Sequence, residues 1–327
     1  MEVRIIDAAR ADVVPVGRLT SVLSDAETLV WVDVPHCDEE AIEALREAFG
    51  FHPVAIRECV ERQRMPKFHA YADHFFAVLH SPERGQHGHV HYVEIDQFIG
   101  AGYLVTVHGP TNPAVPADVP LQDTSAVWAR IASGGFHPQT PVEISHAVIT
   151  AMALRMEETI ESVTADVWSL EQRVIGGQLG DPEAFLDEMF RTRHALLAVA
   201  NVTGNDLEVQ EQMASADRGI GDRDRACLND SVDLLRRANR LAGSQREYLE
   251  GVIEFYRTRT DTRTEIAAER LAVIAVVTLP ITALASVLGM NVIVNDRTQL
   301  PWLILSLMIM LTMSAYLLKW AREHGWW

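Results

Sequence analysis

Gly289, Met290 and Asn291 close a long apolar segment, and their residue types suit the coordination of a hydrated cation. The side-chain amide of Asn291 offers a neutral oxygen, and hard divalent cations take oxygen ligands. Such an oxygen can order the water shell of a passing ion without trapping it, and conduction requires release as well as binding. Gly289 removes a side chain where we expect the helix to end and the backbone to turn. The alternative is that both residues only cap a helix.

A stripe of side chains precedes this tripeptide at steps of four, four, three and four residues, which places its members on one face of a helix. The stripe consists of Leu271, Ala275, Leu279, Thr282 and Ser286. A face that alternates between apolar and weakly polar groups can line a pore and close it by dewetting. The same face can instead pack against another helix, for which small residues are also favoured.

Three histidines alternate at His87, His89 and His91, so they share one face if the segment is a regular strand. Imidazoles suit Zn²⁺ better than Mg²⁺. Gly85 and Gly88 favour the other interpretation, an exposed polar turn between two strands.

Charge and cysteine content restrict the function classes. The 327 residues hold 28 Lys and Arg against 45 Asp and Glu, a formal net charge of −17, which argues against non-specific nucleic-acid binding and favours cations as partners. The three cysteines, Cys37, Cys59 and Cys227, form no C-x-x-C motif and indicate a reducing compartment. No motif of nucleophilic, phosphate-binding or zinc-hydrolase type occurs, so we expect no enzymatic activity.

Two uncharged apolar runs must position the stripe and the tripeptide. Residues 271–290 and 301–318 are long enough to cross about 30 Å of hydrocarbon as helices, and about ten residues separate them. The alternative is a pair of buried core helices, but such helices usually keep a polar face. Arginines before the first run and Lys319 and Arg322 after the second place both termini in the cytoplasm. The N-terminus has no signal-peptide pattern.

The first 270 residues carry a net charge of −18 and read as an α+β domain that continues into long helices. We expect strands at 27–34, 75–80, 89–99 and 103–107, and helices at 38–49 and from His52-Pro53 onward. These strands predict a small mixed sheet. Helix formers then dominate at 142–175, 182–214 and from about 222 into the first apolar run. Such a stalk needs apolar partners, which predicts a symmetric homo-oligomer.

The tripeptide in this context resembles the signature of the CorA family of divalent-cation transporters. The resemblance extends to Pro280 and Thr282 in the first apolar run, to 251–256 in the stalk, and more weakly to His52-Pro53 and 64–67. It implies a funnel-shaped homopentamer in the cell membrane, with a ring of five Asn291 side chains at the external mouth. It also implies a passive pathway for Mg²⁺, and for Co²⁺ or Ni²⁺, with no cofactor. The partners it implies are membrane lipid and identical subunits.

Further residue roles follow from the same resemblance. The stripe corresponds to pore-facing positions, with Leu271 and Leu279 at a hydrophobic constriction and Glu265 near the cytosolic mouth. Glu58 and Asp230, with Asp233 one turn further on, match acidic positions that bind a regulatory divalent cation between subunits. The alternative for each carboxylate is a solvated helix face. High cytosolic Mg²⁺ is then expected to close the pore.

The chain also departs from the family pattern. Arg57 replaces an acidic residue before Glu58, Glu265 replaces an amide, and the external loop contains 295–298 in place of an acidic motif. These differences leave the ion open between Mg²⁺, Co²⁺, Ni²⁺ and, as in the ZntB-like branch, Zn²⁺. A membrane-anchored scaffold or sensor without transport is the second function class. The expected organisation is a cytosolic α+β domain (1–138), a helical region and stalk (139–270), a first span (271–291), an external loop (292–300), a second span (301–319) and a tail (320–327).

Overall fold

A computed structural model describes residues 1–7, 11–25, 28–177, 180–216, 220–292 and 300–323. Residues 293–299, most of the expected external loop, and the last four residues of the expected tail lie outside this description. The chain divides into two compact units, Met1–Val252 and Ile253–Trp327. One helix contributes to both units.

A seven-stranded mixed sheet forms the centre of the first unit, in the order β2-β1-β3-β7-β6-β5-β4. The strands are β1 (Glu2–Ile6), β2 (Ala11–Val14), β3 (Leu29–Val34), β4 (Lys67–Ala70), β5 (His74–Arg84), β6 (Val90–Gly100) and β7 (Tyr103–His108). Only β3 and β7 pair in parallel among these strands. The tight connection between β5 and β6 is a 3₁₀ turn, Gln86–Gly88, in which Gly88 has a φ of 74°.

Alternating side chains of the strands feed two cores, one on each face of the sheet. Trp31, Leu79 and Leu104 pack with the long helices on one face. Val32, Phe76 and Val105 pack on the other face, with the short helices α2 (Glu39–Glu47) and α3 (Pro53–Val60). The sheet is therefore covered on both sides, which explains why its central strands are apolar nearly throughout.

Local sequence signals fix the short helices. The carboxylate of Asp38 accepts a hydrogen bond from Ala41 N and begins α2, and the ring of His52 accepts one from Val54 N and begins α3. Pro53 occupies the first turn of α3, where a missing N–H costs nothing. The remaining short helices are α1 (Leu19–Leu23) and α4 (Gln122–Ala132).

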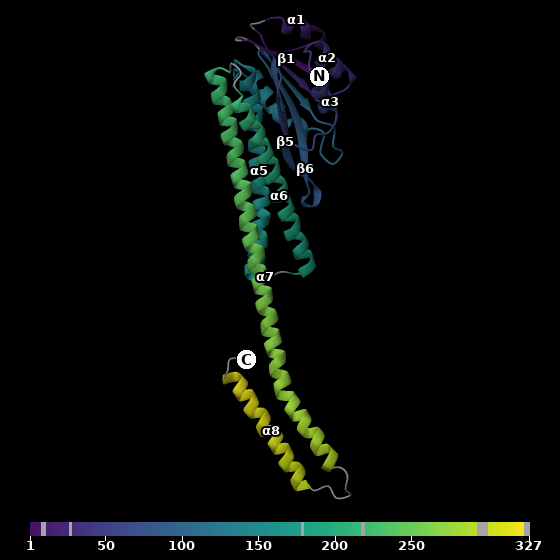
Figure 1. The fold of residues 1–327 in the computed structure, drawn as a ribbon, viewed down its shortest axis with the longest axis vertical. Helices are drawn as coiled ribbons and strands as arrows, with labels where there is room; N and C mark the ends of the chain where they lie inside the picture. The colour runs from purple at the N-terminus through teal and green to yellow at the C-terminus, as the bar shows by residue number, and fades with distance from the viewer. Residues whose placement is uncertain (8–10, 26–27, 178–179, 217–219, 293–299, 324–327) are drawn as a thin grey trace. The chain divides into compact units, whose positions relative to one another are not determined.

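Three long helices complete the first unit: α5 (Pro141–Gly176), α6 (Pro182–Ser215) and the beginning of α7 (Asp222–Val292). They run side by side in Figure 1. Side-chain contacts between α5 and α7, and just before α5, join residues that are 80 to 85 positions apart along the chain. Because this separation along the chain changes little from one contact to the next, α5 and α7 run parallel to each other.

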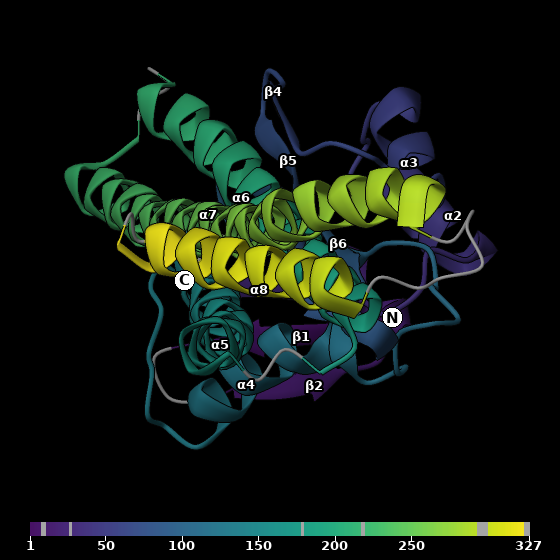
Figure 2. The ribbon, with the colours of Figure 1, turned by 90° about the horizontal axis from the view of Figure 1, so that it is seen from below.

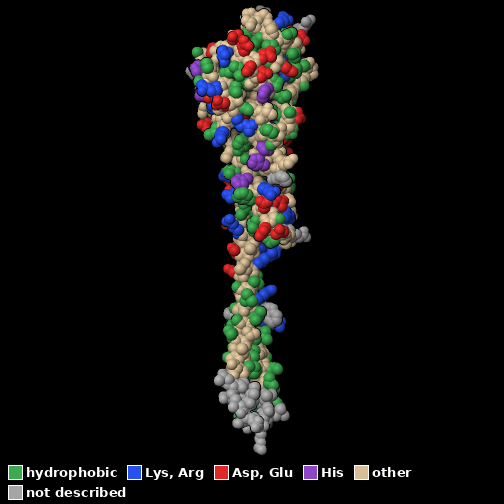
Figure 3. Space-filling view, turned by 90° about the vertical axis from the view of Figure 1, so that its right-hand side faces the viewer, with side chains coloured by type: hydrophobic (Ala, Val, Ile, Leu, Met, Phe, Trp, Pro, Cys, Tyr) green, Lys and Arg blue, Asp and Glu red, His purple; other side chains and the backbone are tan. Residues whose placement is uncertain are grey.

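The second unit contains the rest of α7 and all of α8 (Leu300–Glu323), which run in opposite directions (Figures 1 and 2). Both helices are long and apolar enough to cross a membrane. Residues 271–292 of α7 contain no charged side chain, and the lower part of the described surface in Figure 3 is mainly hydrophobic and uncharged. Val273 and Ala321 are the buried apolar side chains among the described residues of this unit.

The expected strands and helices are present with boundaries shifted by a few residues, and the mixed sheet is confirmed. The sheet is larger than expected, because β1, β2 and β4 add short strands at its two ends. Helix α4, which follows a proline-rich stretch at 110–120, was also not expected. Helix α7 ends at Val292, one residue beyond the expected limit of the first span at 291, and Gly289 lies in its last turn.

Candidate functional site

The predicted stripe lies on an exposed face of α7. Leu271 and Leu279 each expose 67% of their surface, and Ala275, Thr282 and Ser286 are exposed with them. Glu265 is also exposed. The hydroxyl of Thr282 donates to Thr278 O at 2.8 Å, so within one chain it is satisfied by its own helix. The structure therefore shows a largely apolar surface that a single chain does not cover.

The opposite face of α7 is the one that packs within the unit. Val273 is buried, and Val277, Pro280, Ile281 and Leu284 are partly buried. At about 100° per residue, the centre of this set lies roughly 180° from the centre of the stripe. The helix therefore separates a packed face from a free face, and the stripe occupies the free one.

The backbone of Gly289, Met290 and Asn291 is helical. The positions of their side chains lie outside the part of the chain that the structure describes. Asn291 is the second-last residue of α7 and follows the stripe by five residues. The proposed amide ring at this end of the helix stays a prediction.

Glu58 is held in place by a cation from the sheet. Its Oε1 lies 2.8 Å from Lys67 Nζ, and Lys67 also donates to the side-chain oxygen of Gln63 at 2.8 Å. The second carboxylate oxygen of Glu58 is buried and accepts no hydrogen bond within the chain. In the single chain Glu58 therefore pairs with Lys67 through one oxygen, and its other oxygen is enclosed.

Asp230 and Asp233 lie on α7 and have other partners. Asp230 Oδ2 is 3.2 Å from His146 Nε2, and Asp233 Oδ1 is 2.7 Å from Arg236 Nη1. Burial lowers the pKa of His146, while Asp230 and Glu143 oppose this shift. Within one chain, the described His, Cys, Asp and Glu side chains form no group of three that could hold a metal ion. A site shared between subunits therefore stays a prediction.

The three alternating histidines do not share one regular strand. His87 lies in the 3₁₀ turn between β5 and β6, and His91 lies in β6. The rings of His89 and His91 are 5.0 Å apart and meet edge to face. The alternative prediction from Gly85 and Gly88, a turn between two strands, is confirmed.

Several buried polar groups were missed by the sequence reasoning. Asp33 on β3 accepts hydrogen bonds from Arg4 at 3.0 Å and Thr106 at 2.6 Å, and its Oδ1 lies 3.0 Å from His108 Nε2. Burial alone raises the pKa of Asp33, but His108 and Arg4 outweigh it and hold the pKa below its ordinary value. In the sequence, the position of Asp33 within an otherwise apolar strand is the signal that could have indicated this network.

Asp96 on β6 is another buried carboxylate, and both of its oxygens lack a hydrogen-bond partner by geometry. Burial and the neighbouring Glu94 raise its pKa well above the ordinary value. This shift favours the uncharged form of Asp96 within the sheet.

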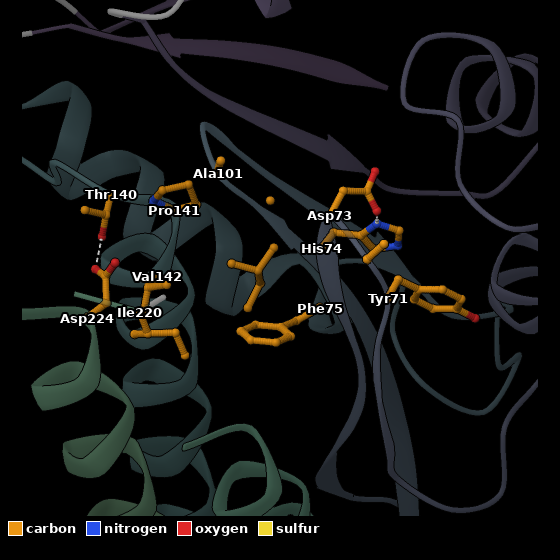
Figure 4. Close-up of a pocket in the computed structure, with 13 residues that line it drawn as sticks. Tyr71, Asp73, His74, Phe75, Ala101, Thr140, Pro141, Val142, Ile220 and Asp224 are labelled. Carbon is orange, nitrogen blue, oxygen red and sulfur yellow. Dashed lines mark hydrogen bonds and ion pairs between the residues drawn. The ribbon is translucent and has the colours of Figure 1, made fainter. Parts of the chain in front are cut away.

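A cavity of about 340 Å³ lies where β4 meets β5 and where α5 and α7 begin (Figure 4). Asp73 Oδ1 is 2.7 Å from His74 Nδ1 at one side, and the hydroxyl of Thr140 donates to Asp224 at 2.5 Å at the other. Phe75 and Val142 lie between them. The Thr140–Asp224 contact ties the first turn of α7 to the start of α5.

The chain has a globular α+β unit and a pair of antiparallel apolar helices, the end of α7 and α8. This organisation is that of a membrane protein with two spans. The chain belongs to the CorA-like Mg²⁺ transporter protein family, whose model matches residues 26–320. The match covers the candidate pathway and most of the α+β unit. As a member of a transporter family, the protein is a divalent-cation transporter of the membrane and not an enzyme.

Known relatives agree with this assignment. The chain is 24% identical over 307 residues to the putative metal ion transporter YfjQ of Bacillus subtilis, covering 90% of this chain and 89% of the relative. Its fold is similar to the complete CorA magnesium transporter of Methanocaldococcus jannaschii, with a TM-score of 0.80, 12% identity and coverage of 100% and 99% of the two chains.

Two other solved structures share the fold. Full-length CmaX matches with a TM-score of 0.76 and 15% identity, covering 98% of this chain and 97% of the other. The ZntB cytoplasmic domain of Vibrio parahaemolyticus matches with a TM-score of 0.61 and 10% identity, covering 80% of this chain and 98% of that domain.

Proposed function

We propose that the protein conducts divalent cations passively, with Mg²⁺ as the preferred ion and Co²⁺ and Ni²⁺ as further substrates. The observation that carries this proposal is the free face of α7. Leu271 and Leu279 are exposed in the single chain, while the opposite face of the helix is packed.

A homopentamer gives this free face its partners. Five copies of α7 around one axis turn the stripe toward a common pathway and remove its leucines from lipid or water. Rings of apolar side chains can then close the pathway by dewetting, and Thr282 and Ser286 provide hydroxyls above them. Asn291 forms the ring at the external mouth, and both termini of each chain face the cytoplasm.

Cytosolic divalent ions regulate the proposed channel. Glu58 of one subunit and Asp230 and Asp233 of its neighbour are the proposed ligands. Carboxylates that face each other across an interface repel unless a cation lies between them. Metal binding thus holds subunits together and favours the closed state, and loss of metal lets them separate.

Zn²⁺ transport by the same architecture is the second candidate. The fold similarity to a ZntB cytoplasmic domain favours it. The charges of Asp296 and Arg297 in the loop between the spans also cancel, so this loop has no net negative charge that would attract Mg²⁺. A membrane-anchored scaffold without transport is the remaining alternative.

Ion uptake by proteoliposomes that contain the purified protein tests these candidates. Under an inside-negative potential we expect Mg²⁺ uptake that grows with the potential and is reduced by Co²⁺ or Ni²⁺ as competitors. Zn²⁺ uptake without Mg²⁺ uptake assigns the protein to the zinc-transporting branch. An absence of ion uptake by folded oligomers contradicts conduction and favours the scaffold.

A further inference from the structure

Three arginines on α7, just before the uncharged run, form a row on one side of the helix. Arg259, Arg263 and Arg270 fall within about 40° of one another at about 100° per residue, and we call them the arginine row. Asp261 and Glu265 lie roughly 140° to 180° from the centre of this row. Directly above the hydrophobic part of the surface, Figure 3 shows Lys and Arg along one edge of the chain and Asp and Glu along the other.

Arg263 and Arg270 have no local counterion. No Asp or Glu stands three or four residues before or after either of them, the spacing at which side chains on a helix can pair. Both are exposed, and among the described residues neither takes part in an ion pair. Arg257 on the other side of α7 differs, because Glu254 precedes it by three residues and Asp261 follows it by four. The positive charge of Arg263 and Arg270 is therefore left for a partner outside the helix.

Exposed apolar side chains share the side of the arginine row. Ile266 stands between Arg263 and Arg270, and Phe255 precedes the row; they expose 43% and 51% of their surface. Both fall within about 60° of the centre of the row. A helix side that combines arginines with apolar side chains is typical of a segment in contact with a membrane surface.

The arginine row ends where the first span begins. Arg270 directly precedes the uncharged run 271–290, and Arg263 stands about 10 Å further from it at about 1.5 Å per residue. Lipid headgroups occupy the layer next to the hydrocarbon, so this spacing puts Arg270 at the headgroups and Arg263 at their outer surface. Helix α8 runs in the opposite direction and brings Lys319 and Arg322, both exposed, to the same end of the pair.

We propose that Arg263 and Arg270, together with Lys319 and Arg322 of α8, bind the phosphate headgroup of an anionic phospholipid. Guanidinium groups bind phosphate oxygens through paired, charge-assisted hydrogen bonds. The row lies roughly 140° from the centre of the stripe, so in a pentamer whose stripe faces the axis it points outward. The site needs only the two spans. It therefore goes beyond the proposed conduction and applies equally to an anchored scaffold.

Equilibrium binding of radiolabelled lipid to the immobilised full-length protein in detergent tests the proposal, with anionic phosphatidylglycerol compared with zwitterionic phosphatidylcholine. We expect the wild type to bind phosphatidylglycerol with the lower dissociation constant. Arg263→Gln and Arg270→Gln should each raise that constant about fivefold, and the double variant about 25-fold, which is the effect expected of cations near an anionic surface. Both side chains are exposed, so the variants should form oligomers as the wild type does, and size-exclusion chromatography checks this.

Arg257→Gln is the matched control, because it removes the same charge from the other side of α7. It should bind phosphatidylglycerol as the wild type does. Inorganic phosphate provides a second comparison, and at equal ionic strength it should displace the lipid no better than chloride does. Equal affinity for the two lipids, wild-type affinity in the double variant, or an equal loss in Arg257→Gln overturns the site. Stronger displacement by phosphate than by chloride overturns the lipid as its occupant.

Discussion

Leu279 and Leu271 are the residues on which closure of the proposed pathway depends. They are the most exposed leucines of the α7 stripe and lie two helical turns apart. A ring of leucine side chains repels water at a constriction, and a hydrated ion cannot pass a dry segment.

We therefore expect Leu279→Ser to raise Mg²⁺ uptake at high internal Mg²⁺ by about tenfold, equivalent to a barrier lower by about 1.4 kcal/mol. The hydroxyl keeps water in the constriction. Val276→Ser is the control, since Val276 is exposed on the same helix but outside the stripe. Equal uptake by the two variants argues against a hydrophobic gate at Leu279.

Asp33 stabilises the α+β unit through a buried network with Arg4, Thr106 and His108. Asp33→Asn leaves the buried Arg4 guanidinium with only the half-exposed Glu2 as a negative partner, at a cost of about 3 kcal/mol. Because the folded pKa of Asp33 lies below its unfolded value, its contribution is present above the unfolded pKa and is lost as pH falls through the folded one.

Thermal unfolding of the full-length protein in detergent, followed across pH, measures this effect. The melting temperature of Asp33→Asn should lie several degrees below that of the wild type at pH 7, and the difference should shrink below about pH 4. A difference that is constant with pH, or absent, would show that the charge of Asp33 is unimportant.

At the scale of elements, Asp206 attaches helix α6 to strand β5. His80 lies beyond the end of β4, so its backbone N–H has no neighbouring strand on that side and donates to Asp206 at 3.1 Å. Asp206→Leu removes this acceptor and should destabilise the unit by about 1–3 kcal/mol. Asp206→Asn keeps an acceptor oxygen and is the matched control.

The pH response of this contact has the opposite sign to that of Asp33. Burial raises the folded pKa of Asp206, so its contribution is present below the unfolded pKa and is lost as pH rises through the folded one. Melting curves of the wild type should decline with rising pH more than those of Asp206→Asn. Identical pH profiles for the two proteins would contradict a raised pKa of Asp206.

The long elements were predictable from sequence and the short ones were not. Runs of helix formers between proline and glycine residues predicted helices α5 and α6. Runs of β-branched and aromatic residues predicted strands β5, β6 and β7. Strands β2 and β4 have four residues each and are partly exposed, so they carry no clear alternation. Strands β2 and β4 form because they pair with neighbouring strands, and a local sequence pattern carries no information about such pairing.

The candidate sites divide in the same way. The α7 stripe follows from helical spacing alone, and its exposure in the structure agrees with that spacing. The contact of His146 with Asp230 joins residues 84 positions apart, and it became visible only when the register of α5 and α7 was known. The pairing of Lys67 on β4 with Glu58 on α3 likewise depends on tertiary structure and not on a local pattern.

At the scale of the whole molecule, metal-dependent contacts between subunits are the proposed basis of regulation. We expect the double variant Glu58→Gln/Asp230→Asn to retain Mg²⁺ uptake but to require at least about tenfold more internal Mg²⁺ for inhibition, because two carboxylates leave the proposed interface. Asp187→Asn is the control, as Asp187 is an exposed carboxylate paired with Arg191. Inhibition at the wild-type concentration in the double variant would place the regulatory site elsewhere.

The central claim is that five Asn291 side chains form the selective entrance of a channel. The most direct test is Mg²⁺ uptake into proteoliposomes under an inside-negative potential, with wild type, Asn291→Ala and the α8 control Thr312→Val compared at equal amounts of intact oligomer. Uptake should be lost in Asn291→Ala, while Thr312→Val should retain it. Wild-type uptake by Asn291→Ala would contradict the claim.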